Sequence, residues 1–225
     1  MRMPRDATRL WKSLYLVATV LRPFLCRLVV EGREHVPAAG GVVLAANHPG
    51  GIDVVFLGYA SPRQIHYMAK HELFQIHPLF AGFIRAAGAF PVRRGQKDRE
   101  AIAYAVRLVQ EGKVLGMFPE GTRNRGRGLL RGKPGTVRIA MEAGAPIVPT
   151  GIVGVPEWHR TWYRPGPRPQ VTVRFGEPLF FPRDTEDPAI VQARTDQLML
   201  AIARLLPPDQ WGVYAERLQG ALARP

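Results

Sequence analysis

Short apolar runs alternate along the chain with segments of helical periodicity, and this alternation constrains the fold more than any other feature. It is the pattern of β-α-β units, in which helices join parallel strands and pack on the faces of the sheet. The 225 residues suffice for one such domain with a full core but are few for two. We therefore predict a single α/β domain, with a central, mostly parallel sheet flanked by helices. The expected strands are 28–31, 42–46, 64–69, 114–118, 147–152 and 171–175.

Helices are predicted between these strands from apolar residues that recur at helical spacing. Gly144 follows one of them as a stop signal, because glycine readily adopts the left-handed conformation of a helix end. Asp187 and Pro188 together mark a beginning, since aspartate caps the first turn and proline fits the first helical position. The stretch 88–95 reads as a short extended piece that ends in arginines. The expected helices are 53–59, 78–87, 97–110, 135–143, one from Asp187 to the Pro207-Pro208 pair, and a short last one near Trp211, Tyr214 and Leu218.

The first 27 residues differ from the rest, because basic residues there precede an apolar run. Secretory signals begin in this way, but no small-residue cleavage site follows, since Arg22, Pro23 and Arg27 interrupt the run. We therefore expect the segment to be retained. The uncharged stretch between Lys12 and Arg22 has nine residues, whereas a membrane-spanning helix needs about 20.

Residues 1–27 are instead predicted to form amphipathic helices, interrupted at Pro23, that lie on a membrane surface. Aromatic, cationic and aliphatic residues together are typical of an interfacial helix. The alternative is an N-terminal helix docked on the core. Residues 28–225 are assigned to the α/β domain. The side chains expected to touch the membrane are those of Trp11, Leu14, Tyr15 and Phe24.

The chain is strongly basic, with 31 lysines and arginines against 18 acidic residues and a formal net charge of +13. Such a balance favours an anionic partner: nucleic acid, a membrane surface or a phosphorylated substrate. The single cysteine, Cys26, excludes internal disulfides and multi-cysteine metal sites. No helix-turn-helix, zinc-finger or RRM signature is present, so we predict no nucleic acid and keep a non-catalytic basic module as a distant alternative.

The stretch 44–53, LAANHPGGID, places a histidine and an aspartate where a buried strand ends. Open α/β sheets bind their ligands at the carboxyl ends of their strands. On a helix, His48 and Asp53 would point about 140° apart. Across a bend, Asp53 could accept the Nδ1–H bond and leave Nε2 free as a base. The alternative is a turn histidine without catalytic role.

A base of this kind needs a hydroxyl to act on, and the chain offers no nucleophile for it. There is no G-x-S-x-G motif, and Cys26 lies in an apolar segment. We therefore expect the hydroxyl to belong to the substrate.

The stretch 118–123, FPEGTR, brings a second set of polar residues to the end of a predicted strand. Gly121, Thr122 and the guanidinium of Arg123 suit a phosphate group, which arginine grips through paired hydrogen bonds. The alternative is a solvated basic loop. Arginines at 93 and 94, after a short extended piece, could reach the same anion.

These motifs, in this order, resemble those of the glycerolipid acyltransferases, and of the lysophosphatidic acid acyltransferases (PlsC-like proteins) in particular. The N-H-x-x-x-x-D block matches at Asn47, His48 and Asp53, and the F-P-E-G-T-R block matches in full. The second block matches in part, with Arg93 where an acid or amide is common. A proline-bracketed apolar strand matches at 145–149.

The resemblance implies that His48 deprotonates the free hydroxyl of a lysophospholipid, that Asp53 orients His48, and that the hydroxyl oxygen attacks an acyl thioester. It implies no metal and no cofactor, with acyl-CoA or acyl carrier protein as donor and phosphatidic acid as product. Another lysophospholipid or an amino-acid lipid is an alternative acceptor. The expected location is the cytoplasmic face of a bacterial membrane, on an anionic surface. The supporting residues implied are Asn47 for the oxyanion; Glu120, Gly121, Thr122, Arg123 and Arg94 for the acceptor phosphate; and Arg93 and Lys133 as further phosphate or donor contacts.

Overall fold

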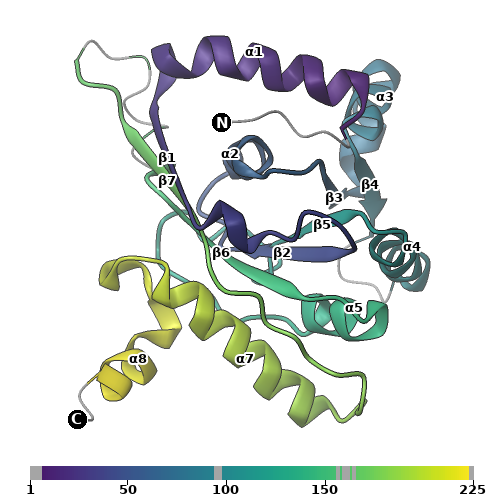
Figure 1. Ribbon diagram of the computed structural model, residues 1–225, viewed down its shortest axis with the longest axis vertical. Helices are drawn as coiled ribbons and strands as arrows, with labels where there is room; N and C mark the ends of the chain where they lie inside the picture. The colour runs from purple at the N-terminus through teal and green to yellow at the C-terminus, as the bar shows by residue number, and fades with distance from the viewer. Residues whose placement is uncertain (1–6, 94–97, 156–157, 159–162, 164–165, 223–225) are drawn as a thin grey trace.

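The computed structural model describes residues 7–93, 98–155, 158, 163 and 166–222, which form an α/β fold around one seven-stranded sheet (Figure 1). The strand order is β1-β7-β6-β2-β5-β3-β4, and the described pairs are parallel except β6 with β7. The predicted fold class is therefore confirmed. The strands are β1 (Arg27–Glu31), β2 (Val42–Ala46), β3 (Ile65–Lys70), β4 (Ala89–Val92), β5 (Val114–Met117), β6 (Ile147–Val153) and β7 (Gln170–Phe175).

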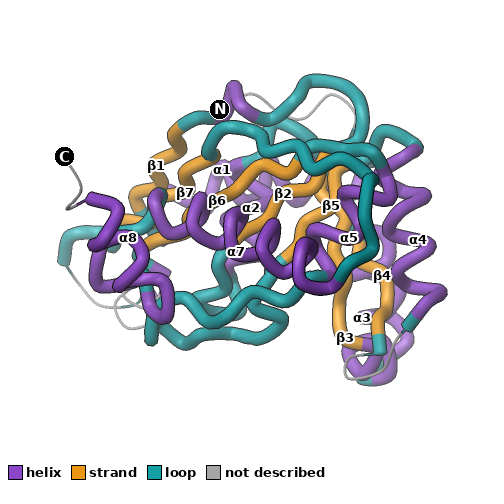
Figure 2. Tube along the Cα trace, turned by 90° about the horizontal axis from the view of Figure 1, so that it is seen from below, coloured by secondary structure: helices purple, strands orange, loops and turns teal. Residues whose placement is uncertain are grey.

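Helices cover both faces of this sheet (Figures 1 and 2). Of the sequence signals, Gly144 ends its helix at φ 64°, and the Asp187 carboxylate caps another by accepting the Ala189 N–H bond at 2.8 Å. The helices are α1 (Arg9–Leu25), α2 (Asp53–Ala60), α3 (Pro78–Ala86), α4 (Arg99–Gln110), α5 (Gly135–Ala143), α7 (Pro188–Arg204) and α8 (Ala215–Leu222), joined by short 3-10 turns that include η2 (His71–Gln75) and η4 (Gly212–Tyr214).

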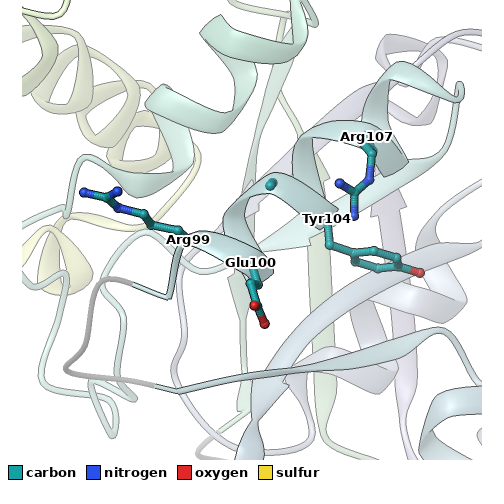
Figure 3. A pocket seen from close by; sticks show the side chains of 5 residues that line it. Arg99, Glu100, Tyr104 and Arg107 are labelled. Atoms are coloured by element: carbon teal, nitrogen blue, oxygen red, sulfur yellow. The ribbon is translucent and has the colours of Figure 1, made fainter.

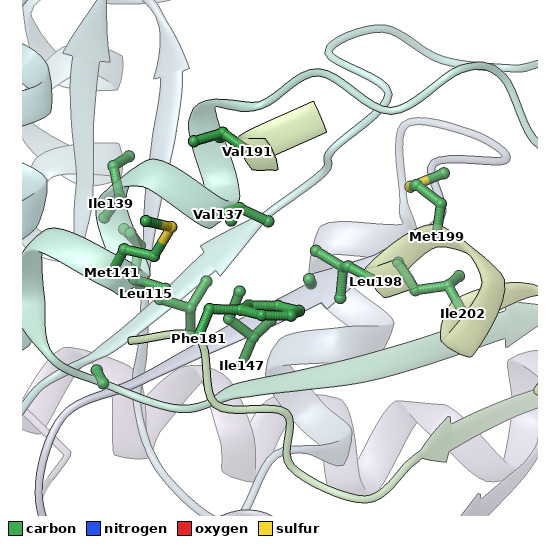
Figure 4. Packing of buried hydrophobic residues seen from close by; sticks show 14 of the residues in the cluster. Leu115, Val137, Ile139, Met141, Ile147, Phe181, Val191, Leu198, Met199 and Ile202 are labelled. Atoms are coloured by element: carbon green, nitrogen blue, oxygen red, sulfur yellow. The ribbon is translucent and has the colours of Figure 1, made fainter. Parts of the chain in front are cut away.

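The core has two halves, one on each side of the sheet. Strand β2 is buried on both faces, as its unbroken apolar run predicts for a central parallel strand. Val43 and Ala45 point into the larger half, beneath α4, α5 and α7, and Figure 4 shows its packing. Val42, Leu44 and Ala46 point into the smaller half, beneath α2. The carboxyl end of β2 thus emerges from the most buried part of the fold.

Strand β4 was expected only as an extended piece, and the structure gives it a place at the edge of the sheet. It pairs with β3 from Ala89 to Val92. Pro91 lies within it, which an edge strand tolerates because one side of its backbone needs no partner. The expected last helix begins after Tyr214, since Trp211 caps the 3-10 turn η4 and Tyr214 lies in it.

Helix α1 differs from its prediction in two ways. It runs unbroken through Pro23, which lies in the last turn, and the N–H of Cys26 donates to the carbonyl of Arg22 beyond it. Two of its aromatic residues, Trp11 and Tyr15, also face the protein. Tyr15 is buried and stacks on Tyr59, with ring centroids 4.6 Å apart, and Trp11 packs against Gly58 of α2.

The prediction that Tyr15 contacts a membrane is therefore wrong, because its side chain is buried, while Trp11 is half-buried against α2. Leu14 is half-buried, whereas Phe24 is 64% exposed. Among the described helices none is long and apolar enough to cross a membrane. The outward side of α1 carries Leu16, Val17, Val20, Leu21 and Phe24.

Candidate active site

His48 and Asp53 meet across the bend that follows β2. The Nδ1–H of His48 donates to Asp53 Oδ2 at 2.7 Å, and both side chains are buried. Asp53 is the first residue of α2, while His48 is the second residue after β2, so the turn between strand and helix brings them together. Within the described residues no hydrogen bond engages His48 Nε2. The predicted geometry of a base and its orienting acid is thus present.

The carboxylate of Asp53 is held by more than the histidine. Its Oδ2 also accepts the N–H bond of Gly50 at 3.0 Å, and its place in the first turn of α2 favours a negative charge. Burial, with Asp53 nearby, raises the pKa of Tyr67 well above its usual value, and the Tyr67 hydroxyl donates to the Val54 carbonyl at 2.9 Å. The Tyr67 hydroxyl therefore stays protonated and is held in one position beside Asp53.

The ring of His48 rests on an aromatic stack. Phe118 lies parallel to it with centroids 4.1 Å apart, and Tyr67 lies beyond Phe118 at 6.4 Å. Gly116 makes room for Tyr67, because a β-carbon there would stand 2.4 Å from the ring. The stack fixes the plane of the imidazole. The sequence did not predict this stack, because its residues are far apart along the chain. Phe118 follows β5, whereas Tyr67 lies within β3.

Glu120 does a different task from the one predicted. Its buried carboxylate accepts the backbone N–H of His48 at 2.7 Å and that of Leu130 at 2.9 Å. Burial raises the pKa of Glu120, although these hydrogen bonds oppose the rise. A carboxylate engaged in this way holds the backbone of the histidine in place, and both of its oxygens have partners within the protein.

Asn124 completes that support and was not predicted. Its backbone N–H donates to the His48 carbonyl at 2.9 Å, and its Nδ2 lies 3.2 Å from both oxygens of Glu120. The backbone of His48 is therefore held on both its N–H and its carbonyl by the loop that follows β5. Asn124 follows Glu120 by four residues, a spacing that forms no recognisable motif, so the sequence held no signal for it.

Asn47 also departs from its predicted role. Its amide bonds the backbone of Ile152 in both directions: Nδ2 donates to the carbonyl at 2.9 Å and Oδ1 accepts the N–H bond at 2.7 Å. Only 2% of the residue is exposed. Asn47 therefore links the end of β2 to β6. Both polar atoms of its amide are used in this link, so the structure favours a supporting role over the predicted contact with an oxyanion.

Two exposed basic side chains, Arg123 and Lys133, each lie against a glycine of the site. The guanidinium of Arg123 lies 3.3 to 3.5 Å from the point where a β-carbon on Gly51 would stand. The ammonium of Lys133 lies 3.0 Å from the corresponding point on Gly121, which has φ +69°. Thr122 is exposed beside them. Of the predicted phosphate-binding residues, Arg123 thus lies against the bend between His48 and Asp53, and Lys133 lies against Gly121 in the loop after β5.

Comparisons with known proteins agree with these motifs. The Acyltransferase family model matches residues 27–153, more than half of the chain. This chain belongs to the acyltransferase family. The resemblance seen in the sequence and the assignment as an acyltransferase enzyme are therefore confirmed.

Among its relatives is the 1-acyl-sn-glycerol-3-phosphate acyltransferase of Bacillus subtilis, 38% identical over 151 residues, which cover 67% of this acyltransferase and 72% of the relative. The protein of the same name from Borreliella burgdorferi is 31% identical over 127 residues, or 56% of this chain and 51% of its own length. The crystal structure of the 1-acyl-sn-glycerophosphate (LPA) acyltransferase PlsC from Thermotoga maritima matches with a TM-score of 0.65 and 21% identity, covering 96% of this chain and 80% of that one. This last likeness supports the shared fold.

The structure does not bring Arg93 to the loops of the site as it does Arg123. Arg93 of the acyltransferase is exposed at the end of β4, and its backbone N–H donates to Asp98 Oδ2 at 2.9 Å. Asp98 also caps α4, and these two backbone hydrogen bonds lower its pKa. Arg94, predicted to hold the acceptor phosphate, lies outside the described residues.

A shallow hollow lies on α4, away from these loops (Figure 3). Arg99, Glu100, Tyr104 and Arg107 line it, all from a single helix. None of the predicted site residues of the acyltransferase reaches it. In the described part of the chain no three histidine, cysteine, aspartate or glutamate side chains gather as they would around a metal ion.

Proposed function

We propose that this acyltransferase moves a fatty acyl group from an acyl thioester to the free hydroxyl of lysophosphatidate, giving phosphatidate, with His48 as general base. The thioester is carried by coenzyme A or by acyl carrier protein. The observation that carries the proposal is the 2.7 Å hydrogen bond from His48 to Asp53, with Arg123 above the same loop. The names of the relatives from Bacillus and Borreliella support the choice of acceptor.

The proposed reaction needs one base and no covalent acyl-enzyme. His48 Nε2 takes the proton from the acceptor hydroxyl while the hydroxyl oxygen attacks the carbonyl carbon of the thioester. The tetrahedral intermediate collapses, the carbon–sulfur bond breaks, and the imidazolium returns its proton to the leaving thiolate. Asp53 stabilises the imidazolium and keeps Nδ1 protonated, and Phe118 holds the ring in one plane.

The acceptor phosphate is assigned to Arg123 and Lys133. Both side chains are exposed, so their charges are available to a ligand, and each rests on a glycine that leaves room for it. A guanidinium binds a phosphate through two parallel hydrogen bonds, and an ammonium adds a point charge. Glu120 is left out of this group and acts through the backbone of His48.

We also propose that the protein lies on the cytoplasmic surface of a membrane. The support for this location is the outward side of α1, whose Leu16, Val20 and Phe24 are each more than half exposed. Such a helix lies in the interface with its apolar side toward the acyl chains. The net charge of +13 suits an anionic leaflet.

The first experiment replaces the base. His48→Ala should purify with a normal fold and lose acyl transfer to lysophosphatidate by about 10²- to 10⁴-fold, the usual contribution of a general base. Asp53→Asn should lose less, because the imidazole remains. His35→Gln, outside the site, is the control and should retain activity. A folded His48→Ala enzyme with undiminished transfer would show that the base assignment is wrong.

The second experiment tests the phosphate contact. Arg123→Ala should raise the KM for lysophosphatidate by about 10-fold or more, as expected for a charge-assisted hydrogen bond. It should leave the KM for a monoacylglycerol, which lacks the phosphate, unchanged. Arg127→Ala, exposed on the same loop, is the matched control. Equal effects on both acceptors would refute the contact, and a panel of lysophospholipids with both donor carriers would identify the preferred substrates.

A further inference from the structure

The segment formed by η2 and α3 leaves large apolar side chains outside the protein. Leu79 is 79% exposed and Ile76 66%, and Leu73, Phe80 and Phe83 are also exposed. Ala81 is the buried residue among the nine of α3. Soluble proteins seldom group exposed apolar residues in this way unless the group binds something. We name these five residues the α3 apolar surface.

The α3 apolar surface is held in place by the residues around it. Leu79, Phe80 and Phe83 follow one another at helical spacing on one side of α3. Phe74 of η2 points inward, and the guanidinium of Arg85 stands 4.9 Å from the centre of its ring. His77 caps the helix by accepting the Leu79 N–H bond. The exposure is therefore a property of an ordered helix and its turn.

The sequence that carries this surface is basic. Residues 73–97 contain no aspartate or glutamate, while they contain Arg85, Arg93, Arg94 and Lys97. Arg85 and Arg93 are exposed in the structure. Glu72 and Asp98 bracket the stretch on either side. Apolar residues among cations are the combination that binds an anionic lipid leaflet, because acyl chains and headgroups are both matched.

The position of the surface relates it to the active site. Turn η2 begins directly after β3, so it lies at the carboxyl edge of the sheet, and β3 is the parallel neighbour of β5. The loop with Glu120 and Arg123 follows β5 at that same edge. Figure 2 shows α3 beside the ends of β3 and β4. Helix α1, in contrast, packs through Trp11 on Gly58, in the second half of α2.

We propose that the α3 apolar surface seats the protein on an anionic bilayer at the edge of the sheet where His48 lies. This contact is separate from the outward side of α1 and turns the catalytic edge toward the lipid. The inference rests on the proposed function in one respect only, that the acceptor is a lipid of the same bilayer. Binding to a lipid surface itself needs no catalysis.

The test removes the apolar surface and leaves the fold. Ile76→Ser with Leu79→Ser should lower the partition coefficient of the full chain onto phosphatidylglycerol–phosphatidylcholine vesicles by about 10-fold or more, given the apolar area withdrawn from lipid. Phe180→Ser with Val213→Ser, at similarly exposed positions, is the matched control and should bind as wild type. Both variants should unfold at the wild-type temperature. Arg85→Gln should weaken binding to the anionic vesicles but not to pure phosphatidylcholine.

Two results would overturn the proposal. The first is wild-type vesicle binding by the Ile76, Leu79 double variant. The second is a wild-type chain that sediments as a dimer and a variant that sediments as a monomer with unchanged vesicle binding, because the surface would then cover a second copy. Vesicle binding is measured without substrate, so a chain that binds vesicles through this surface but fails to acylate lysophosphatidate would refute the proposed function alone.

Discussion

Helices α1 and α7 are both 17 residues long and lie on opposite sides of the sheet, yet they direct their apolar side chains oppositely. Helix α7 buries Val191, Leu198, Met199 and Ile202 in the larger half of the core. Helix α1 buries Tyr15 and leaves five large apolar residues in contact with solvent. The difference indicates that α7 belongs to the folding core, whereas α1 presents a surface for something outside the protein.

The two helices also stand differently toward the active site. Gly132, in the loop that follows β5, lies against Thr195 and Met199 of α7, where a β-carbon would stand 2.9 and 2.5 Å from their side chains. That loop carries Leu130, whose N–H donates to Glu120, and Glu120 in turn holds His48. Helix α7 therefore supports His48 through the loop after β5, whereas α1 packs through Trp11 on α2, the helix that begins at Asp53.

The largest expected effect is a loss of stability when a buried side chain of α7 is removed. Leu198→Ala removes a fully buried side chain from α7 and should lower the free energy of unfolding by about 2–5 kcal/mol. Leu16→Ala on α1, where the residue is 57% exposed, should lower it by less than about 0.5 kcal/mol. Urea unfolding followed by circular dichroism measures both. Equal losses would mean that α1 is as much a part of the core as α7.

The next effect concerns Glu120, at the end of the chain of contacts that begins at α7. Burial raises its pKa, so the native carboxyl keeps its proton to a higher pH than the carboxyl of the unfolded chain. The native state then binds more protons across that interval, and its stability falls as pH rises upward from about 4.5.

Glu120→Gln cannot ionise and should lose this dependence. We expect the unfolding free energy of the wild type, relative to Glu120→Gln, to decrease between pH 4 and pH 7. Urea unfolding at several pH values measures the difference. A difference that stays constant or increases with pH would contradict the view that burial governs this carboxyl.

Part of the fold and of the site could be predicted from the sequence. The unbroken apolar run of β2 and the motif after it were enough to predict a buried parallel strand with His48 and Asp53 at its end. The interaction of the two side chains followed from the chemistry of a bend. Local patterns of this kind are visible in a sequence because the partners are few residues apart.

The roles of Glu120 and Asn47 could not be predicted, because their partners are backbone groups far along the chain. Glu120 bonds the N–H of His48, 72 residues away, and Asn47 bonds Ile152, 105 residues away. Backbone groups leave no trace in the residue types. The sides of α1 were misassigned for another reason: apolar residues occur around most of that helix, so periodicity alone did not separate the inward Tyr15 from the outward Val20.

A smaller effect tests the outward half of the comparison. Leu16→Ser with Val20→Ser should leave the unfolding temperature unchanged and lower partition onto anionic vesicles by about 10-fold, because both side chains are more than half exposed. Vesicle sedimentation measures the binding. The pair Ile190→Ser and Val213→Ser, also exposed, is the control. Vesicle binding that is unaffected by loss of the α1 side chains would assign α1 to packing alone.

The smallest effect compares the caps of the two helices. Asp187 accepts the Ala189 N–H bond at 2.8 Å at the start of α7, and Thr8 accepts the Trp11 N–H bond at 3.3 Å at the start of α1. Asp187→Ala should lower the global free energy of unfolding by about 1 kcal/mol, a typical loss for a cap.

Thr8→Ala removes a similar bond, but from a helix that buries one residue of its own. Its loss should therefore appear as faster amide exchange in the first turn of α1, with little change in the global unfolding transition. Hydrogen exchange on both variants separates local from global opening. If Thr8→Ala lowered global stability as much as Asp187→Ala, α1 would unfold together with the core, and its exposed side would be the outer layer of one cooperative unit.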